Sequence, residues 1–385
     1  MLPNRPLEDV VVLDLTRVLA GPFCTMVLRD LGADIIKVEP PTGDDARAFG
    51  PFLEGNGEGN GKPVSSYFAS LNCGKRSVVL DLKVESDQMR FAELVRGADV
   101  LVENYRPGTL AKLGFDKTRL DELNPDLVYA AISGFGATGP YAKRPAYDMI
   151  IQALSGLVSI TGTEAGERVR VGTSIADIVS GLYAAIGIVA GLNRKQTRGG
   201  GARIDLSMLD ATVSVLENAV ARYQVSGEPP VPLGSRHPSI APFEAFAAAD
   251  GEVVIAAGND RLFATLCHVM ARPDLVDDQQ FASNVLRMSN VVALKRELEG
   301  TLGSRTVAHW VDLLTEVGVP VAQVNTVADL FTDPQLQQRG MLQPVEGLHG
   351  FQVTGSPLKF EGVAEETSRP AAPSLGEHNE ELLHQ

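Results

Sequence analysis

The apolar positions in the first third of the chain fall into short runs separated by turns and by segments of helical period. Residues 22–31 and 85–95 carry apolar residues at helical spacing, and Pro22 suits the first turn of its helix. The short apolar runs, predicted to be strands, are residues 10–15, 33–38, 77–82, 98–103 and 127–133. Strands that alternate with helices predict an α/β fold with an open, largely parallel sheet.

The most apolar segment of the chain is residues 171–192, with the sequence VGTSIADIVSGLYAAIGIVAGL. It predicts a long helix whose one charged residue is Asp177, with no Lys, Arg or His inside the segment to pair with it. One interpretation is a capping box, in which Ser174 and Asp177 satisfy free N–H groups of the first turn. The other is a nucleophile, because a carboxylate can attack an activated acyl group without a partner base. Several glycines predict a close approach by another part of the chain, namely Gly172, Gly181, Gly187 and Gly191.

The first strand and helix resemble the start of a dinucleotide-binding unit, and Glu39 stands where an acid that binds ribose would lie. The turn after the first strand, however, reads TRVLAGP, so it lacks G-x-G-x-x-G and carries Arg17 instead. This argues against nicotinamide binding. Residues 43–61 are rich in Gly, Asp and Pro and predict a surface loop.

The composition narrows the classes of function, and the kinds of catalytic group, that the protein is expected to have. The chain has 385 residues, 44 % hydrophobic content and a formal net charge of −14, which argues against a nucleic-acid or anionic-membrane binder. Its three cysteines are scattered, so we expect reduced thiols, no zinc site and a soluble cytoplasmic protein. The first of six histidines is His237, which disfavours Ser-His-Asp or His-based chemistry before it. Carboxylates or hydroxyls are the remaining candidates in that region.

Cations recur directly after the predicted strands, often beside Gly or Asn. A parallel sheet could gather them on one side, because ligands of open sheets bind at the carboxyl ends of the strands. Such a patch in an acidic protein suits a phosphorylated ligand. Its members are Arg17, Lys37, Lys75, Arg76, Arg106, Lys112 and Lys143.

The segments VLDLTRVLAGPF, GADIIKVEPP, LNCGKRS, ADVLVENYRPG and GFGATGPY, followed by the Asp177 segment, occur in this order. Together they resemble the family III coenzyme A transferases, from about Leu7 to Asn379. The resemblance implies a large open-sheet Rossmann-like domain with a smaller α/β domain. It also implies a homodimer of interlocked chains, with CoA thioesters as substrates and no permanently bound cofactor.

In the family that this chain resembles, the residue at the position of Asp177 is the nucleophile. It forms a mixed anhydride with the donor acyl group and then a thioester with CoA, which passes to the acceptor acid. The family's CoA contacts match Arg17, Val18, Ala20, Lys37, Asn72, Lys75, Arg76, Asn104, Tyr105, Arg106, Lys112 and one of Lys143 and Arg144, of which Lys143 is predicted here. Tyr147 and Asp148 match residues that line the family's site, and Gly258 and Asn259 lie where the family has a mobile loop. His237, in the proline-rich segment, is either a contact for the substrate carboxylate or a structural loop histidine.

Two alternatives to a transferase remain open. The same fold hosts α-methylacyl-CoA racemases, which need two acid/base groups on opposite faces of the substrate. Tyr147 and Asn259 stand where those racemases carry a histidine and a glutamate, which favours a transferase. A CoA-binding protein without turnover is the other alternative, and Asp177 in a matching segment argues against it. Succinyl-CoA is a plausible donor, since Arg and His near the pocket could hold a second carboxylate.

The remaining sequence predicts the domain organisation. Residues 229–242 contain four prolines and predict a linker, residues 251–260 predict a strand and turn, and residues 319–324 predict a further strand. We therefore expect a large domain of residues 1–228 and 318–385, with a small domain of residues 229–317 inserted between its two parts.

Overall fold

The chain folds into two compact units, which the computed structural model describes at residues 4–58 and 62–383. The first unit comprises residues 1–158, 170–229 and 334–385, and the second comprises residues 159–169 and 230–333. The second unit is therefore larger than the predicted small domain, since it also takes residues 159–169 and 318–333.

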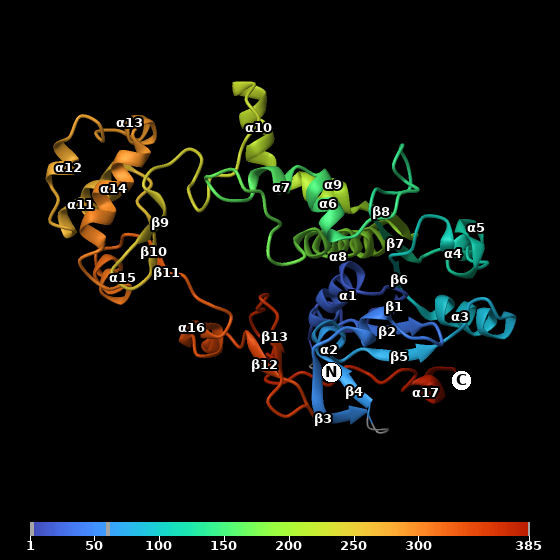
Figure 1. Cartoon of the computed structure of the whole chain (residues 1–385). Helices are drawn as coiled ribbons and strands as arrows, with labels where there is room; N and C mark the ends of the chain where they lie inside the picture. Colours follow the sequence, from blue (N-terminus) through green and yellow to red (C-terminus); the bar gives the residue numbers. More distant parts are fainter. Residues whose placement is uncertain (1–3, 59–61, 384–385) are drawn as a thin grey trace. The chain divides into compact units, whose positions relative to one another are not determined.

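A six-stranded parallel sheet forms the centre of the first unit (Figure 1). The strand order is β5-β2-β1-β6-β7-β8, and every neighbouring pair is parallel. The strands are β1 (Val11–Asp14), β2 (Asp34–Glu39), β5 (Arg76–Val79), β6 (Val100–Glu103), β7 (Val128–Ser133) and β8 (Ala202–Ser207). Five of them lie where the hydrophobic runs predicted strands, which confirms the α/β expectation with a large parallel sheet.

Successive residues of the central strands enter opposite cores, as the pleat of a strand requires. Val12 belongs to the apolar cluster under α1 (Ala20–Asp30) and α8 (Ile175–Arg198), and Leu13 belongs to the cluster under α3 (Glu85–Gly97) and α5 (Lys117–Leu123). Both faces of the sheet are thus covered, and this explains why its strands read as continuous apolar runs rather than alternating ones.

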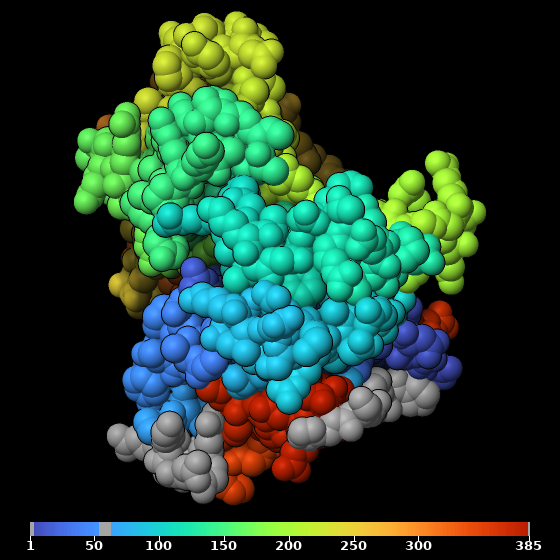
Figure 2. All heavy atoms as spheres, turned by 90° about the vertical axis from the view of Figure 1, so that its right-hand side faces the viewer, coloured from blue at the N-terminus to red at the C-terminus, as the bar shows by residue number. Residues whose placement is uncertain are grey.

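The C-terminal segment returns to the sheet that the N-terminal half builds. Helix α17 (Asn379–Leu383) lies along β5, and the Asn379 side chain accepts a 2.8 Å hydrogen bond from the Val79 N–H (Figure 1). In the space-filling view the C-terminal residues, in red, lie directly against the light-blue surface of the N-terminal half (Figure 2). The two ends of the chain therefore complete one unit.

Helix α8 packs closely on α1 and on the sheet, and its glycines permit this. A Cβ on Gly181 would lie 2.7 Å from the Ala20 carbonyl oxygen of α1, and one on Gly191 would lie 2.9 Å from the Val128 side chain. The predicted close approach is thus present at both glycines, whereas a Cβ on Gly172 would meet open space. Within residues 4–58 and 62–383, α8 is the helix whose length and composition could also cross a membrane, but its Ala184 and Ile188 are buried in the core.

The predicted loop at residues 43–61 is wrong in part. It contains a 3-10 turn, η1 (Asp45–Ala48), and the strand β3 (Phe52–Glu58), which pairs with β4 (Lys62–Ser65), while residues 59–61 lie outside the described residues. The other elements of this unit are α2 (Ser66–Asn72), α4 (Thr109–Lys112), α6 (Asp148–Leu154), α9 (Met208–Ser214), α10 (Glu217–Ser226), α16 (Pro334–Gln338), β12 (Leu342–Pro344) and β13 (Gln352–Thr354). Helix α7 (Leu157–Ile160) stands at the boundary where the chain leaves this unit for the second one.

The second unit has its own three-stranded antiparallel sheet, in the order β11-β10-β9, and its own core. The strands are β9 (Phe243–Ala247), β10 (Glu252–Ala256) and β11 (Val321–Gln323); the helices are α11 (Asp260–Val269), α12 (Asp274–Asp277), α13 (Asn284–Ser289), α14 (Val291–Leu302) and α15 (Val307–Glu316), followed by the turn η2 (Asp329–Phe331). Because β11 pairs with β10, the strand predicted at residues 319–324 belongs to this unit and not to the large one.

Candidate active site

A cavity of about 160 Å³ lies at the carboxyl edge of the parallel sheet in the first unit. Loops after β1, β6 and β7 meet there with the first turn of α8, which is the edge where open α/β sheets bind ligands. Its polar and aromatic lining residues are Arg17, Asn104, Tyr105, Arg106, Ser133, Arg144, Tyr147 and Asp177, and Val18 of the first loop also lines it.

Asp177 lies in the first turn of α8, half-buried in this cavity. Among the described residues, its carboxylate has no hydrogen-bond or ion-pair partner. Burial, and next the negative charge of Asp148, raise the pKa of Asp177 to about 7. A carboxylate with raised basicity and free oxygens, held in a pocket, has the properties of a nucleophile or a general base.

The capping-box interpretation of this turn is wrong in its partners. Ser174 is the N-cap of α8, but its side chain makes no capping hydrogen bond. Asp148, which begins α6, caps the helix instead, because its carboxylate accepts a 2.9 Å bond from the Ala176 N–H and a 2.7 Å bond from Gln152. Gln152 in turn accepts a 2.9 Å bond from the Val171 N–H. A buried carboxylate on a neighbouring helix therefore fixes the start of α8 and leaves Asp177 free.

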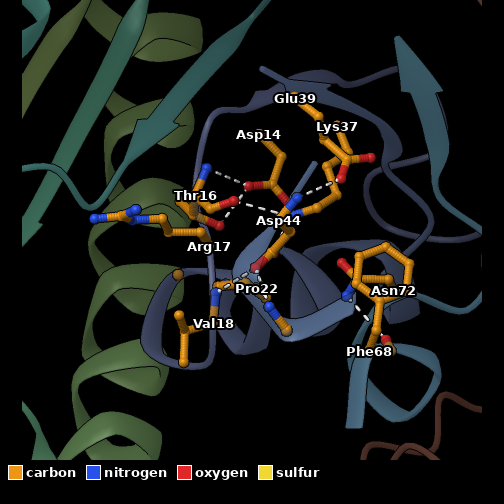
Figure 3. Close-up of polar contacts among 12 residues, drawn as sticks. Asp14, Thr16, Arg17, Val18, Pro22, Lys37, Glu39, Asp44, Phe68 and Asn72 are labelled. Carbon is orange, nitrogen blue, oxygen red and sulfur yellow. Dashed lines mark hydrogen bonds and ion pairs between the residues drawn. The ribbon is translucent and has the colours of Figure 1, made fainter. Parts of the chain in front are cut away.

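The loop after β1 carries three residues whose backbone groups are bound by side chains from elsewhere, and Figure 3 shows the bonds of Thr16 and Val18. Asn104 accepts a 3.0 Å bond from the Arg17 N–H and donates a 2.8 Å bond to the Arg17 carbonyl oxygen. The Val18 N–H donates to Asp44 at 3.1 Å, and the Lys37 ammonium donates to the Thr16 carbonyl oxygen at 2.8 Å. Side chains of β2, of the turn after β2 and of the residue after β6 thus hold this loop in front of Asp177.

Lys37 and Lys75, predicted as CoA contacts, have internal partners in the structure. The Lys37 side chain is fully buried 2.9 Å from Asp44, and the Lys75 side chain is fully buried 3.1 Å from Asp14. Burial lowers the pKa of Lys37, but Asp14, Asp44 and Glu39 outweigh it and the net shift is upward. Burial lowers the pKa of Lys75 to about 8 despite Asp14. Both lysines belong to a buried network of ion pairs, and neither lines the cavity.

Two further predicted contacts also lie away from the cavity. The Asn72 amide is buried and donates a 2.9 Å bond to the Phe68 carbonyl oxygen, and Arg76 pairs with Asp34 and, at 2.7 Å, with Glu381. The structure gives these side chains structural partners, so a direct contact with CoA stays a prediction for both.

Three arginines face the cavity. Arg17 is exposed and pairs with the equally exposed Asp45 at 3.0 Å, and Arg106 lines the mouth. The guanidinium carbon of Arg144 lies over the Tyr141 ring, 3.8 Å from its centroid. The sequence left the choice between Lys143 and Arg144 open, and the structure places Arg144 in the lining.

Of the remaining site residues predicted in the first unit, some line the cavity and others do not. Ala20 and Asn104 line the cavity, and Tyr147 is 76 % exposed there. Lys112, at the end of α4, is exposed away from the lining, as is Lys143.

A second cavity, of about 310 Å³, lies along the same edge at the ends of β2 and β5. Its walls are mainly apolar, and its charged lining residues are Lys83, Glu39 and Asp81. Tyr105 lines both cavities. Lys83 was missed from sequence because it stands in a run, LDLK, that reads as the end of a strand.

Three predicted residues belong to the second unit. His237 stacks on Phe243, with ring centroids 5.1 Å apart, and accepts a bond from the Ser239 N–H. Asn259 caps α11 by accepting a 2.9 Å bond from the Leu262 N–H, and Gly258 precedes it. Their part in catalysis stays a prediction.

The fold and the cavity define an α/β protein in which a free carboxylate and three arginines meet at the carboxyl edge of a parallel sheet. Residues 7–379 match the model of CoA-transferase family III. The chain is 44 % identical to an acetyl-CoA:oxalate CoA-transferase from Acetobacter aceti, over 99 % of this chain and 95 % of that protein. It is 40 % identical to a succinate–glutarate CoA-transferase from Agrobacterium fabrum, over 99 % and 96 %.

A crystal structure of a CaiB/BaiF family protein from Brucella suis superposes on the chain with a TM-score of 0.87, at 38 % identity and 98 % coverage of both chains. The chain belongs to the family III CoA-transferases.

Proposed function

We propose that this enzyme moves coenzyme A from a donor acyl-CoA to a small dicarboxylic acid, with Asp177 as the covalent nucleophile. The observation that carries the proposal is the placement of Asp177: a carboxylate with no partner among the described residues, set in a cavity beside three arginines. Relatives named for oxalate, glutarate and mesaconate support dicarboxylic acids as the acyl class. Succinyl-CoA is the donor that we would test first, because two similar relatives are named for succinate or succinyl-CoA.

The reaction consists of four exchanges. A carboxylate oxygen of Asp177 attacks the thioester carbonyl carbon, the C–S bond breaks, and CoA thiolate leaves behind an aspartyl anhydride. The thiolate then attacks the aspartyl carbonyl carbon, which releases the donor carboxylate and forms an aspartyl-CoA thioester. The acceptor carboxylate attacks the carbonyl carbon of this thioester, which breaks the C–S bond, releases CoA thiolate and forms a second anhydride. The thiolate then attacks the acceptor carbonyl carbon of that anhydride, which gives the acceptor acyl-CoA and frees the Asp177 carboxylate. No net proton is consumed, because each attacking and leaving group is an anion.

The electrostatics of the cavity suit these steps. Each attack places negative charge on an oxygen next to Asp177, where cations are worth more than in water. Arg17, Arg106 and Arg144 are the cations in the lining. The raised pKa of Asp177 makes its carboxylate a stronger nucleophile, although only about half of it is ionised at pH 7.

The two cavities that share Tyr105 match the two ends of coenzyme A. The apolar walls of the cavity with Lys83 suit an adenine ring, and the cavity with Asp177 suits the thioester. Tyr105 lies between them, and burial raises its pKa to about 12, so its hydroxyl stays protonated and can donate a hydrogen bond.

We also propose that the active form is the interlocked homodimer that the family resemblance implies. An apolar stripe on α8 supports an oligomer, because Leu182, Tyr183 and Ile186 are 42 %, 40 % and 63 % exposed. Sedimentation equilibrium gives the mass of the assembly.

Three free buried cysteines are also in keeping with the expected cytoplasmic location.

The test of the mechanism is mass spectrometry after incubation with succinyl-CoA, with hydroxylamine present to trap an activated carboxylate. We expect a hydroxamate on Asp177 in the wild type and none in Asp177→Asn, whose side chain has the same shape. Asp148 provides a matched control, since the peptide that contains it should stay unmodified in both proteins.

Transfer of CoA to glutarate, oxalate or mesaconate then identifies the acceptor. An enzyme that forms no adduct with any acyl-CoA, but exchanges deuterium next to the thioester, would instead be a racemase and would overturn the proposal.

A further inference from the structure

We propose that Val18 is a positioning residue, held in a strained left-handed backbone conformation by Asn104, Asp44 and Lys37, and that this conformation, enforced by those three side chains, keeps the β1–α1 loop against Asp177. The proposal rests on the proposed function for its kinetic part only. Its stability part stands on the backbone geometry of the loop alone.

The strain lies in the backbone of a β-branched residue. Val18 has φ 66°, and of the described non-glycine residues only Asn4 and Ala271 share a positive φ. For a residue that branches at Cβ this region is a true outlier, because its side chain crowds its own backbone. Such conformations persist only where the surroundings enforce them, and they gather at functional sites.

The surroundings of Val18 enforce this conformation from two sides, and Figure 3 shows the side with Asp44 and Lys37. Asn104 binds both the N–H and the carbonyl oxygen of Arg17, the residue before Val18. Asp44 accepts the Val18 N–H, and its other carboxylate oxygen lies 2.9 Å from the fully buried Lys37 ammonium. Because Lys37 also binds the Thr16 carbonyl oxygen, the peptide groups on both sides of Arg17 are tied to other elements.

The turn has a consequence for the cavity. Four consecutive residues, from Arg17 to Ala20, line it together with Asp177. An extended strand or a helix would turn some of them away, whereas the left-handed residue reverses the chain between the end of β1 and the start of α1. The backbone at Val18 therefore decides where Arg17 lies relative to the nucleophile.

Substitution at Val18 tests the strain directly. Glycine adopts this conformation freely and alanine does not, while both remove the valine side chain. We expect Val18→Gly to melt about 2 °C above Val18→Ala. In the interior of α1 the order should reverse, so that Val27→Gly melts below Val27→Ala, which is the matched control. If Val18→Gly also melts below Val18→Ala, the strain does not exist.

A double-mutant cycle tests the positioning role. Asn104→Ala removes two bonds that hold the loop, so with valine at position 18 the strain should pull the loop out of place. In the Val18→Gly background there is no strain to release. We expect Asn104→Ala to lower kcat for CoA transfer about tenfold more with valine than with glycine at this position.

Each outcome has a separate meaning. Equal losses of kcat in both backgrounds would overturn the positioning role, and any direct contact of Asn104 with CoA cancels in the cycle. If wild-type protein transfers no CoA at all, the proposed function fails, while the order of the Gly and Ala melting temperatures still decides whether Val18 is strained.

Discussion

The raised pKa of Asp177 makes protein stability depend on pH, and Asp177→Asn should remove that dependence. In the folded chain the carboxyl has a pKa of about 7, against 3.8 for an aspartate in its ordinary, solvated state. Between these two pH values the folded protein holds a proton that the unfolded chain has lost. The contribution of Asp177 to the free energy of unfolding should therefore be largest below about pH 4 and should fall as the pH rises to about 7.

The magnitude follows from the shift. About three pKa units at roughly 1.36 kcal/mol each amount to about 4 kcal/mol of lost stability at pH 8.5, and about half of that is already lost at pH 5.5. An asparagine keeps the shape and carries no charge, so the variant should be more stable than the wild type by about 4 kcal/mol at pH 8.5. At roughly 2 °C per kcal/mol, the difference in melting temperature should be about 8 °C at pH 8.5 and about 4 °C at pH 5.5.

Scanning calorimetry of both proteins at the two pH values measures this. Asp9→Asn, at an exposed position, is the control and should melt with the wild type at both pH values. If Asp177→Asn raises the melting temperature equally at both pH values, or less at the higher pH, then burial and the charge of Asp148 do not raise the pKa of Asp177 as argued.

Three further predictions follow from a neighbouring charge, from a backbone angle and from the lining of the cavity. Asp148→Asn removes the neighbouring negative charge, so the pKa of Asp177 should fall below 7 and the acidic limb of the kcat/KM profile should move to lower pH; an unmoved limb would contradict this. Ala271→Gly, at an exposed site after α11, should raise the free energy of unfolding by about 1 kcal/mol, because φ is 56° there and glycine adopts a positive φ more easily than alanine; urea unfolding measures this. Arg144→Gln should raise the KM for acyl-CoA about tenfold and Lys143→Gln should leave it nearly unchanged; equal effects would show that lining the cavity is not what matters.

Much of the fold could be predicted from the chain alone, because its strands are buried on both faces and its helices have clear apolar faces. The run VVVLDL predicts β1, and the apolar segment with Asp177 predicts α8. The loop at residues 43–61 could not be predicted correctly, since its Gly and Asp content is typical of both a loop and a hairpin with tight turns. The boundary of the second unit also depended on pairing between distant strands, β10 and β11.

The candidate site divides in the same way. The sequence by itself identified Asp177 as an unpaired acid in an apolar helix, and Arg17 as the cation after β1, because both are local features of a segment. It could not tell a cation that faces a ligand from one that is buried in an ion pair. Only the tertiary structure decided that Lys37 and Lys75 are buried beside Asp44 and Asp14, since a lysine after a strand looks the same in either role.

The tertiary structure alone also decided what surrounds Asp177. Asp148 caps α8 from another helix and carries its charge toward Asp177, although the two residues stand far apart in the sequence. The conformation of Val18 is likewise imposed by partners from β2, from the turn after it and from the residue after β6, against the residue's own preference. Local sequence determines which elements form, whereas contacts between elements determine the charge and the backbone geometry at the site.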